Sequence, residues 1–188
     1  MNNKATTKEV VVVAMIGAVI GVVYTLMDYA YMPLSAALGA VFMELTFGIY
    51  LLSASLPMYL VRKPGMALFG ALVTAGVNLL LGSPYGIQLV LAGVLQAAGV
   101  ELIYAIFKYK ADMKTLVLSS ALGAVFVYLR DIVFFGTLSY GTLIASGILL
   151  VRHISATVIG ILLVKGISAA LDKTGLLKGF PCTKKIEA

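Results

Sequence analysis

The sequence predicts an all-α integral membrane protein, a bundle of six transmembrane helices with both termini in the cytoplasm. Of its 188 residues, 61% are hydrophobic and only 12% are charged, whereas a soluble domain carries about a quarter charged residues. The apolar residues fall into long runs that short turns separate, and only alternate turns contain lysine or arginine. These observations indicate a single membrane domain, residues 1–188.

The apolar runs are long enough to cross a bilayer as helices. A spanning helix needs about 20 residues to cover roughly 30 Å of hydrocarbon. Lipid offers the backbone no hydrogen-bond partner, so each run is expected to be helical unless it belongs to a barrel, and the short alternation of barrel strands is missing. The expected helices are about 9–27, 45–61, 65–81, 86–107, 115–135 and 142–169.

The connections are less regular than the helices. We expect a loop after the first helix, because this stretch contains Asp28, Tyr29, Tyr31 and Pro33. Residues 34–44 form either a re-entrant segment or a short outer helix. Arg62, Lys63 and Pro64 end the second helix, and residues 82–86, GSPYG, form a turn because Gly and Pro interrupt helices. No small-residue cleavage site follows the first apolar run, which indicates a retained helix and not a signal peptide.

The basic residues of the turns predict the orientation. They precede the first helix, follow the sixth, and occupy the turns after the second and fourth: Lys4, Lys8, Arg62, Lys63, Lys108, Lys110, Lys114, Lys173, Lys178, Lys184 and Lys185. Turns 28–44, 82–85 and 136–141 contain no lysine or arginine. Cytoplasmic loops are enriched in these residues, so both termini are expected in the cytoplasm.

Several classes of function are disfavoured. The net charge of +6 is explained by the loop pattern, so nucleic-acid binding is not expected. Cys182 and His153 are the single cysteine and histidine, too few for a disulfide framework or a site of several Cys or His ligands. Hydrolase, zinc-protease and phosphate-loop motifs are absent. We therefore expect no catalysis, cofactor or metal, and an external energy source for any active transport.

Polar and aromatic residues of several helices meet at the outer side of this topology. The candidate substrate-binding residues there are Glu44, Asn78, Tyr85, Gln88, Arg130, Asp131 and Tyr140, with Tyr24, Tyr29, Tyr31, Phe42, Phe134 and Phe135 at the same level. An aromatic pocket with a few polar groups is typical of a small-molecule site. The alternatives are an interfacial aromatic belt and interhelical contacts. Arg130 and Asp131 point about 100° apart on a helix, which favours separate partners.

Deeper polar residues lie on the fourth and sixth helices. Gln88 and Gln96 share one helical stripe, so Gln96 is expected to line the pocket floor. Glu101 points about 140° away from Gln96, toward another helix or a partner subunit. Arg152 lies beside His153 near the midplane, where it either extends toward the interface or pairs with Glu101.

The first helix carries small residues at a spacing of four. Ala14 and Ala18 form one such pair and Gly17 and Gly21 another. Small residues one turn apart allow a second helix to approach closely. They indicate either packing within the bundle or a docking face for a partner subunit.

Residues 62–110 resemble a known family. The motifs are the turn RKPG (62–65), the loop LLGSPYG (80–86), and a Gln-x-x-Gly-x-Glu-Leu helix from Gln96. With the Ala14/Ala18 motif and the topology, they resemble the S components of energy-coupling-factor (ECF) vitamin transporters, specifically the thiamine-related YkoE group. An acidic residue expected late in the third helix is replaced by Asn78.

The resemblance implies a non-catalytic substrate-binding subunit of ECF S-component fold. It would capture a vitamin outside and pass it inward by reorienting in the bilayer. Partner ATPase subunits would supply energy through a transmembrane coupling subunit, which would dock at Ala14 and Ala18.

Thiamine fits the candidate pocket chemically. Its thiazolium cation would gain about 0.5–2 kcal/mol per good contact with Tyr or Phe. Its aminopyrimidine edge could pair with Glu44, Asn78 or Gln88. Riboflavin and the hydroxymethylpyrimidine precursor remain possible ligands, and a ligand-free scaffold or a stand-alone carrier are the rival functions.

Overall fold

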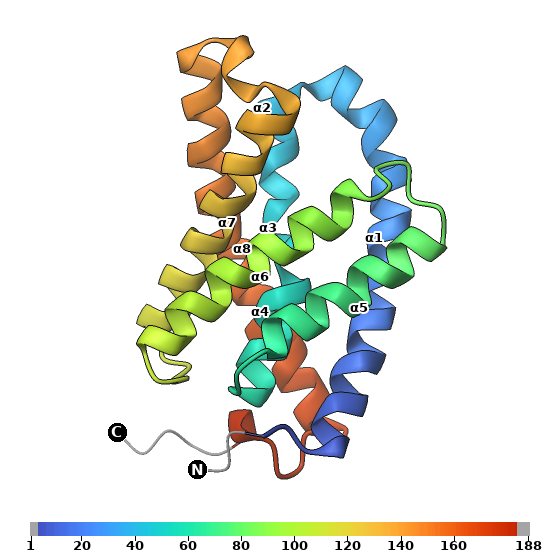
Figure 1. The fold of residues 1–188 in the computed structure, drawn as a ribbon, viewed down its shortest axis with the longest axis vertical. Coiled ribbons are helices and arrows are strands. Elements are labelled where there is room, and N and C mark those ends of the chain that lie inside the picture. The colour runs from blue at the N-terminus through green and yellow to red at the C-terminus, as the bar shows by residue number, and fades with distance from the viewer. Residues whose placement is uncertain (1–3, 184–188) are drawn as a thin grey trace.

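The computed structural model describes residues 4–183, and the regular structure in this range is helical (Figure 1). Its elements are α1 (Thr7–Leu38), α2 (Ala40–Met43), η1 (Glu44–Thr46), α3 (Phe47–Tyr50), α4 (Leu52–Val61), α5 (Met66–Leu80), α6 (Gln88–Ile106), α7 (Met113–Phe135), η2 (Thr137–Tyr140), α8 (Thr142–Lys173) and η3 (Pro181–Thr183). Helices α1, α7 and α8 run along the molecule, and α5 and α6 cross it obliquely. Lys184 and Lys185, assigned above to the cytoplasmic side, lie outside the described residues.

Five helical stretches within residues 4–183 are long and apolar enough to cross a membrane. They are Thr7–Tyr31, Ala40–Val61, Gln88–Ile106, Met113–Phe135 and Thr142–Lys173. Helix α5 is apolar but has only 15 residues, so it is about 22 Å long. The six expected helices therefore all correspond to helical stretches, but the third is shorter than the hydrocarbon core is thick.

The prediction of a loop after the first helix is wrong, because α1 continues as a helix to Leu38. Pro33 lies inside α1 and removes one backbone donor. Two tyrosines attach the extension to neighbouring segments, since Tyr29 Oη donates to a carbonyl of the α5–α6 turn at 2.8 Å and Tyr31 Oη to the last carbonyl of α2 at 3.1 Å. Of the two alternatives for residues 34–44, a short outer helix is closer to the structure, since this stretch contains the end of α1 and all of α2.

The second expected helix is divided into several short elements. Between α3 and α4 the helix is interrupted at Leu51. The buried hydroxyl of Tyr24, from α1, lies 2.7 Å from the carbonyl oxygen of Ile49 and 2.5 Å from that of Tyr50, and accepts from Ser53 N at 3.2 Å. Backbone groups released by a break at membrane depth require partners within the protein. The Tyr24 hydroxyl therefore supplies the partner that the interrupted helix lacks.

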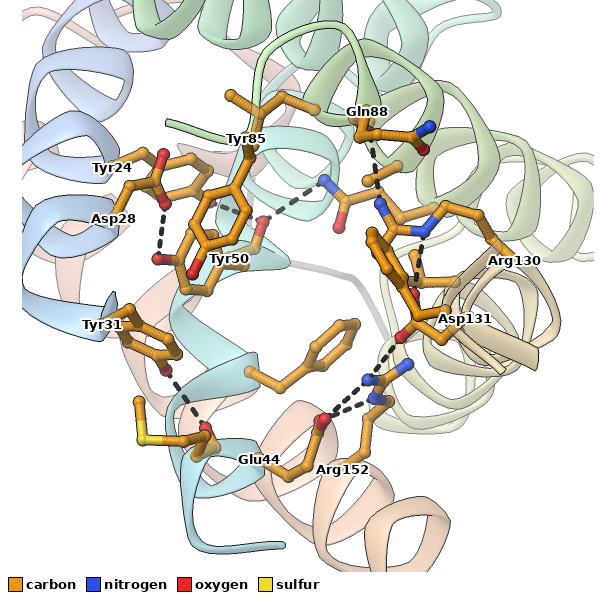
Figure 2. Close-up of a pocket in the computed structure, with 18 of the residues that line it drawn as sticks. Tyr24, Asp28, Tyr31, Glu44, Tyr50, Tyr85, Gln88, Arg130, Asp131 and Arg152 are labelled. Atoms are coloured by element: carbon orange, nitrogen blue, oxygen red, sulfur yellow. Dashed lines mark hydrogen bonds and ion pairs between the residues drawn. The ribbon is translucent and has the colours of Figure 1, made fainter. Parts of the chain in front are cut away.

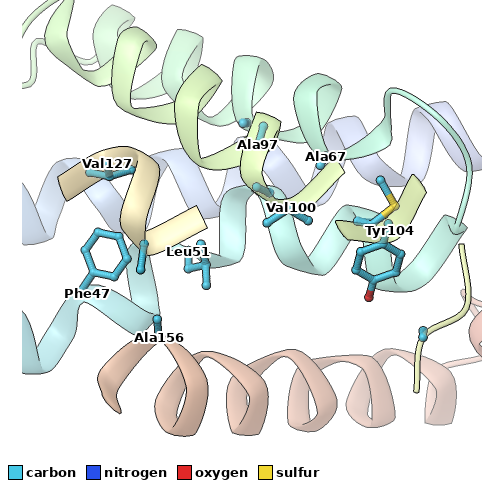
Figure 3. Close-up of a cluster of buried hydrophobic side chains, with 13 residues drawn as sticks. Phe47, Leu51, Ala67, Ala97, Val100, Tyr104, Val127 and Ala156 are labelled. Carbon is cyan, nitrogen blue, oxygen red and sulfur yellow. The ribbon is translucent and has the colours of Figure 1, made fainter. Parts of the chain in front are cut away.

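Two helices of the core approach each other so closely that their contact requires glycine. Figure 3 shows the central cluster, in which Leu51, Ala97 and Val100 are fully buried. Helices α6 and α7 touch at Gly99 and Gly123, where a Cβ added to Gly99 would lie 2.7 Å from the backbone nitrogen of Gly123. Side chains would separate these backbones, so the pair sets the distance between the two helices.

The two pairs of small residues in α1 lie on different faces. A Cβ on Gly21 would lie 2.8 Å from the carbonyl oxygen of Thr74, so Gly17 and Gly21 form the close contact with α5. Ala14 and Ala18 are only partly buried, beside exposed Met15. The glycine pair therefore packs within the bundle, and docking at the alanine pair stays a prediction.

Glu101 makes an interhelical contact, one of its two expected roles. Helix α5 begins after Gly65, which provides no side-chain cap. The Glu101 carboxylate, from α6, accepts a hydrogen bond from the backbone nitrogen of Ala67 in the first turn of α5 at 3.2 Å. A carboxylate at a helix N-terminus satisfies free N–H groups and complements the helix dipole.

Removing this cap should destabilise the protein. Glu101→Leu is expected to lower the free energy of unfolding by about 1–2 kcal/mol, the usual cost of losing an N-cap. Glu101→Gln keeps an oxygen acceptor of the same shape and should lose less. Thermal unfolding in detergent would compare the two variants, and equal losses would contradict a capping role.

Candidate substrate-binding site

A cavity of about 390 Å³ opens at one end of the bundle, which we call the cavity end. This volume lies within the range of small-molecule sites. The cavity is built where α5 and α7 end, where α6 and α8 begin, and along the second half of α1. All eight candidate residues line it: Glu44, Asn78, Tyr85, Gln88, Gln96, Arg130, Asp131 and Tyr140. Their contact with substrate remains a prediction.

One wall of the cavity is organised around Asp28 (Figure 2). Asp28 is 1% exposed, and its carboxylate accepts three hydrogen bonds. The donors are Tyr50 Oη at 2.8 Å, Asn78 Nδ2 at 2.9 Å and Ser83 Oγ at 2.6 Å. Asn78, which the sequence predicts as a residue of this site, therefore also holds the Asp28 carboxylate in place.

Tyrosines form the surface of this wall. The rings of Tyr24 and Tyr50 lie 4.8 Å apart between centroids, and Tyr31 meets Tyr50 edge-on at 5.6 Å. Tyr85 lies in front of Tyr50 in Figure 2. Burial, followed by the negative charge of Asp28, raises the pKa of Tyr85. Its phenol therefore stays neutral at physiological pH, and the wall offers neutral aromatic faces.

The opposite wall holds an ion-pair network centred on Arg152 (Figure 2). The guanidinium binds both carboxylate oxygens of Glu44 at 2.7 Å and Asp131 Oδ2 at 2.7 Å. Its charge also lies 4.7 Å from the centroid of the Phe47 ring. These contacts tie η1 and α7 to α8, far apart in the sequence.

One expectation for these charges is incomplete, and one is wrong. Arg130 and Asp131 do have the separate partners expected, since Arg130 Nη1 donates to the Gln88 carbonyl at 3.1 Å and Asp131 pairs with Arg152, but Arg130 Nη2 also lies 2.5 Å from Asp131 Oδ1. The long Arg130 side chain can fold back across the 100° between neighbouring helix positions. Arg152 pairs with Glu44 and Asp131, and Glu101 instead caps α5.

Gln96 lies at the cavity floor, as its helical stripe predicts. Its Nε2 donates to Ser53 Oγ at 2.5 Å and to the Tyr50 carbonyl at 3.3 Å. The contact joins α6 to the interrupted helix, beside the Tyr24 hydroxyl. Gln96 therefore has a structural role as well as a place at the floor.

Two buried polar atoms of the lining have no partner among the described residues. They are the acceptor Gln88 Oε1 and the donor Arg152 Nη1. Buried polar groups are normally hydrogen-bonded, so these atoms are candidates for contact with a polar ligand. Within residues 4–183, no group of three or more His, Cys, Asp or Glu side chains is arranged to hold a metal ion.

Sequence reasoning missed Asp28, Tyr50 and Arg152 as lining residues. Asp28 was assigned to a loop, although it lies four residues after Tyr24 and so shares its helix face. Tyr50 was assigned to the second helix without a role. No local pattern marks Arg152, because its partners lie 108 and 21 positions away.

Comparison with known proteins agrees with this architecture. The family model described as the permease component of an ABC-type cobalt transport system matches residues 8–127. The chain is 30% identical over 181 residues to the putative HMP/thiamine permease protein YkoE of Bacillus subtilis (strain 168), covering 96% of this chain and 91% of that protein. It also matches a crystal structure of an S component of an ECF transporter, with a TM-score of 0.90, 30% identity and coverage of 95% and 91%.

The Bacillus subtilis relative and the solved structure each align with nearly the whole chain, and the solved structure shares its fold. The chain is therefore a multi-pass membrane protein. The resemblance seen in residues 62–110 extends to the complete helical bundle. The chain belongs to the family of S components, the substrate-binding membrane subunits of ECF transporters.

Proposed function

We propose that this chain captures thiamine, or its hydroxymethylpyrimidine precursor, in the cavity for an ATP-driven ECF importer. The observation that carries the proposal is a small-molecule cavity with a tyrosine wall and two buried polar atoms in its lining that have no partner among the described residues. A flat aminopyrimidine stacks on aromatic rings and has both donors and acceptors along its edge. Gln88 Oε1 and Arg152 Nη1 supply one acceptor and one donor. The Bacillus subtilis relative is named as a putative HMP/thiamine permease, which supports the same ligand class.

The cavity opens to the outside in this proposal. The α4–α5 and α6–α7 turns, which contain Lys63 and Lys108, lie at the end of the bundle opposite the cavity, where the described chain also begins and ends (Figure 1). By the positive-inside rule that end faces the cytoplasm. Both termini are then cytoplasmic, with six membrane-crossing helices that include the short α5.

Transport itself requires partners. The chain would bind substrate without catalysing a reaction, and ATPase subunits would drive its reorientation through a coupling subunit. The half-exposed face of α1 around Ala14 and Ala18 is the proposed docking surface for that subunit.

The direct test is ligand binding by the purified full-length chain. Thiamine and hydroxymethylpyrimidine would be titrated calorimetrically, and co-purifying small molecules identified by mass spectrometry. We expect a Kd below roughly 1 µM, a binding free energy of about −8 kcal/mol, for one of them. If riboflavin binds more tightly than the other two, riboflavin is the substrate in place of thiamine. If none of the three binds, the scaffold function is favoured. Uptake by vesicles that contain this chain alone would favour a stand-alone carrier.

Enlarging the alanine face should separate this subunit from its transporter. Ala14→Leu/Ala18→Leu is expected to abolish complex formation with the coupling subunit, because two larger side chains prevent close helix approach. Thiamine binding should be unchanged, since neither residue lines the cavity. Co-purification of a tagged complex is the measurement.

The matched control is Ala98→Leu/Ala105→Leu, which enlarges two exposed alanines of α6. This variant should keep the complex. An intact complex in Ala14→Leu/Ala18→Leu would contradict the docking assignment.

A further inference from the structure

The charged residues that line the cavity do not balance. Two guanidinium groups, Arg130 and Arg152, face three carboxylates, those of Asp28, Glu44 and Asp131. Glu44 and Asp131 are both ion-paired, and these two carboxylates match the two arginines. Asp28 is left as a negative charge with no ion-pair partner in the part of the chain that the structure describes.

The hydrogen bonds to Asp28 all run toward its carboxylate. Its three partners all offer protons to it, from a phenol, a side-chain amide and a hydroxyl. Burying a carboxylate is costly when only neutral donors surround it, so a cation nearby would offset part of this cost.

The cavity side of Asp28 is aromatic. Asp28 borders the cavity but is only 1% exposed, and Tyr24, Tyr50 and Tyr85 lie around it in Figure 2. The Tyr50 hydroxyl donates to Asp28, which increases the electron density of its ring. Cations bind to the faces of such rings, and a buried negative charge behind them strengthens the attraction.

We propose that Asp28 and Tyr24, Tyr31, Tyr50 and Tyr85 form a cation subsite, so that the cavity selects a positively charged organic substrate over a neutral one. This inference rests on the proposed function and chooses between its two ligands: thiamine carries a permanent charge on its thiazolium ring, and hydroxymethylpyrimidine is neutral. A metal ion fits the subsite poorly because it needs oxygen ligands in direct contact, and the rings cover the carboxylate. Asp28 acts through the rings and is thus a positioning residue.

The substrate's charge can be varied with almost no change of shape. In 3-deazathiamine a neutral thiophene ring replaces the thiazolium. We expect the wild-type chain, in detergent, to bind thiamine about 10- to 100-fold more tightly than this isostere, the range of a charge-assisted contact. Calorimetric titration of both ligands gives the ratio, and a ratio near one overturns the proposal without any variant.

Asp28→Asn removes the charge and keeps the shape. The ratio of the two affinities should fall below about threefold, while hydroxymethylpyrimidine binding should change little. Glu101→Gln is the matched control, since it removes a carboxylate outside the cavity and should keep the wild-type ratio. A general loss of folded protein would weaken thiamine and its isostere equally and would not lower the ratio of their affinities. An unchanged ratio in Asp28→Asn overturns the proposal.

Failure of the proposed function gives a different result. If thiamine, its isostere and hydroxymethylpyrimidine all fail to bind the wild type, the proposed function is wrong. The subsite is then tested with tetramethylammonium, which should raise the melting temperature of the wild type but not of Asp28→Asn. Equal shifts in the two proteins would overturn the cation subsite.

Discussion

Replacing Arg152 with methionine is expected to lower the melting temperature by roughly 6–20 °C. Arg152 is 5% exposed and compensates Glu44 and Asp131 together. Methionine fills much of the space of the arginine stem but leaves the partly buried Glu44 without a cation. Removing one partner of a buried ion pair costs about 3–5 kcal/mol, and in a chain of this size each kcal/mol shifts the melting temperature by about 2–4 °C.

Two further variants separate charge from packing. Lys165→Met removes an exposed cation from the same helix and should shift the melting temperature by less than about 2 °C. Glu44→Gln/Arg152→Met removes both charges of the pair, and Asp131 still has Arg130, so much of the lost stability should return. Thermal unfolding in detergent measures all three, and an Arg152→Met protein as stable as Lys165→Met would contradict the network.

Gly99→Ala is expected to reduce the free energy of unfolding by about 1–3 kcal/mol, the cost of overpacking a filled core. The new methyl group would meet the backbone of Gly123 and Leu122, at distances of 2.7–2.9 Å. Backbone atoms cannot rotate away as a side chain can, so α6 and α7 would have to separate. Both helices line the cavity, and ligand affinity should therefore fall as well.

Gly76→Ala is the matched control for this substitution. Gly76 lies inside α5, and a Cβ there would have no neighbouring atom within 4 Å. Alanine favours the helix by about 0.5–1 kcal/mol relative to glycine, so this variant should be at least as stable as the wild type. Equal destabilisation by the two alanines would show that close packing at Gly99 is not the cause.

The positions of the helices were predictable because lipid restricts the backbone so strongly. An apolar run at membrane depth has to satisfy its own N–H and C=O groups, and a helix does this locally. The expected ranges 86–107 and 115–135 accordingly differ from α6 and α7 by at most two residues at either end. The gathering of Gln88 and Asp131 at one cavity follows from the same reasoning, since alternate helix ends lie on the same side of a bundle.

Errors arose where a residue's partner came from another part of the chain. Asp28 and Tyr29 look like loop residues, yet they lie in a helix because groups of α5 and the α5–α6 turn bind them. The second helix is interrupted at Leu51, and the Tyr24 hydroxyl from α1 satisfies the released groups. Hydropathy and helical periodicity describe one segment at a time, so neither could show these contacts.

The sequence by itself determined the helical membrane class, the approximate ends of the helices and the end of the bundle at which polar residues collect. These properties depend on local composition and on the length of each apolar run. Three further features depend on the tertiary structure: Arg152 pairs with Glu44, Glu101 caps α5, and Asp28 has no ion-pair partner among the described residues. Each of these depends on the distance between side chains of different helices, and that distance is set by how closely the glycine contacts allow the helices to pack.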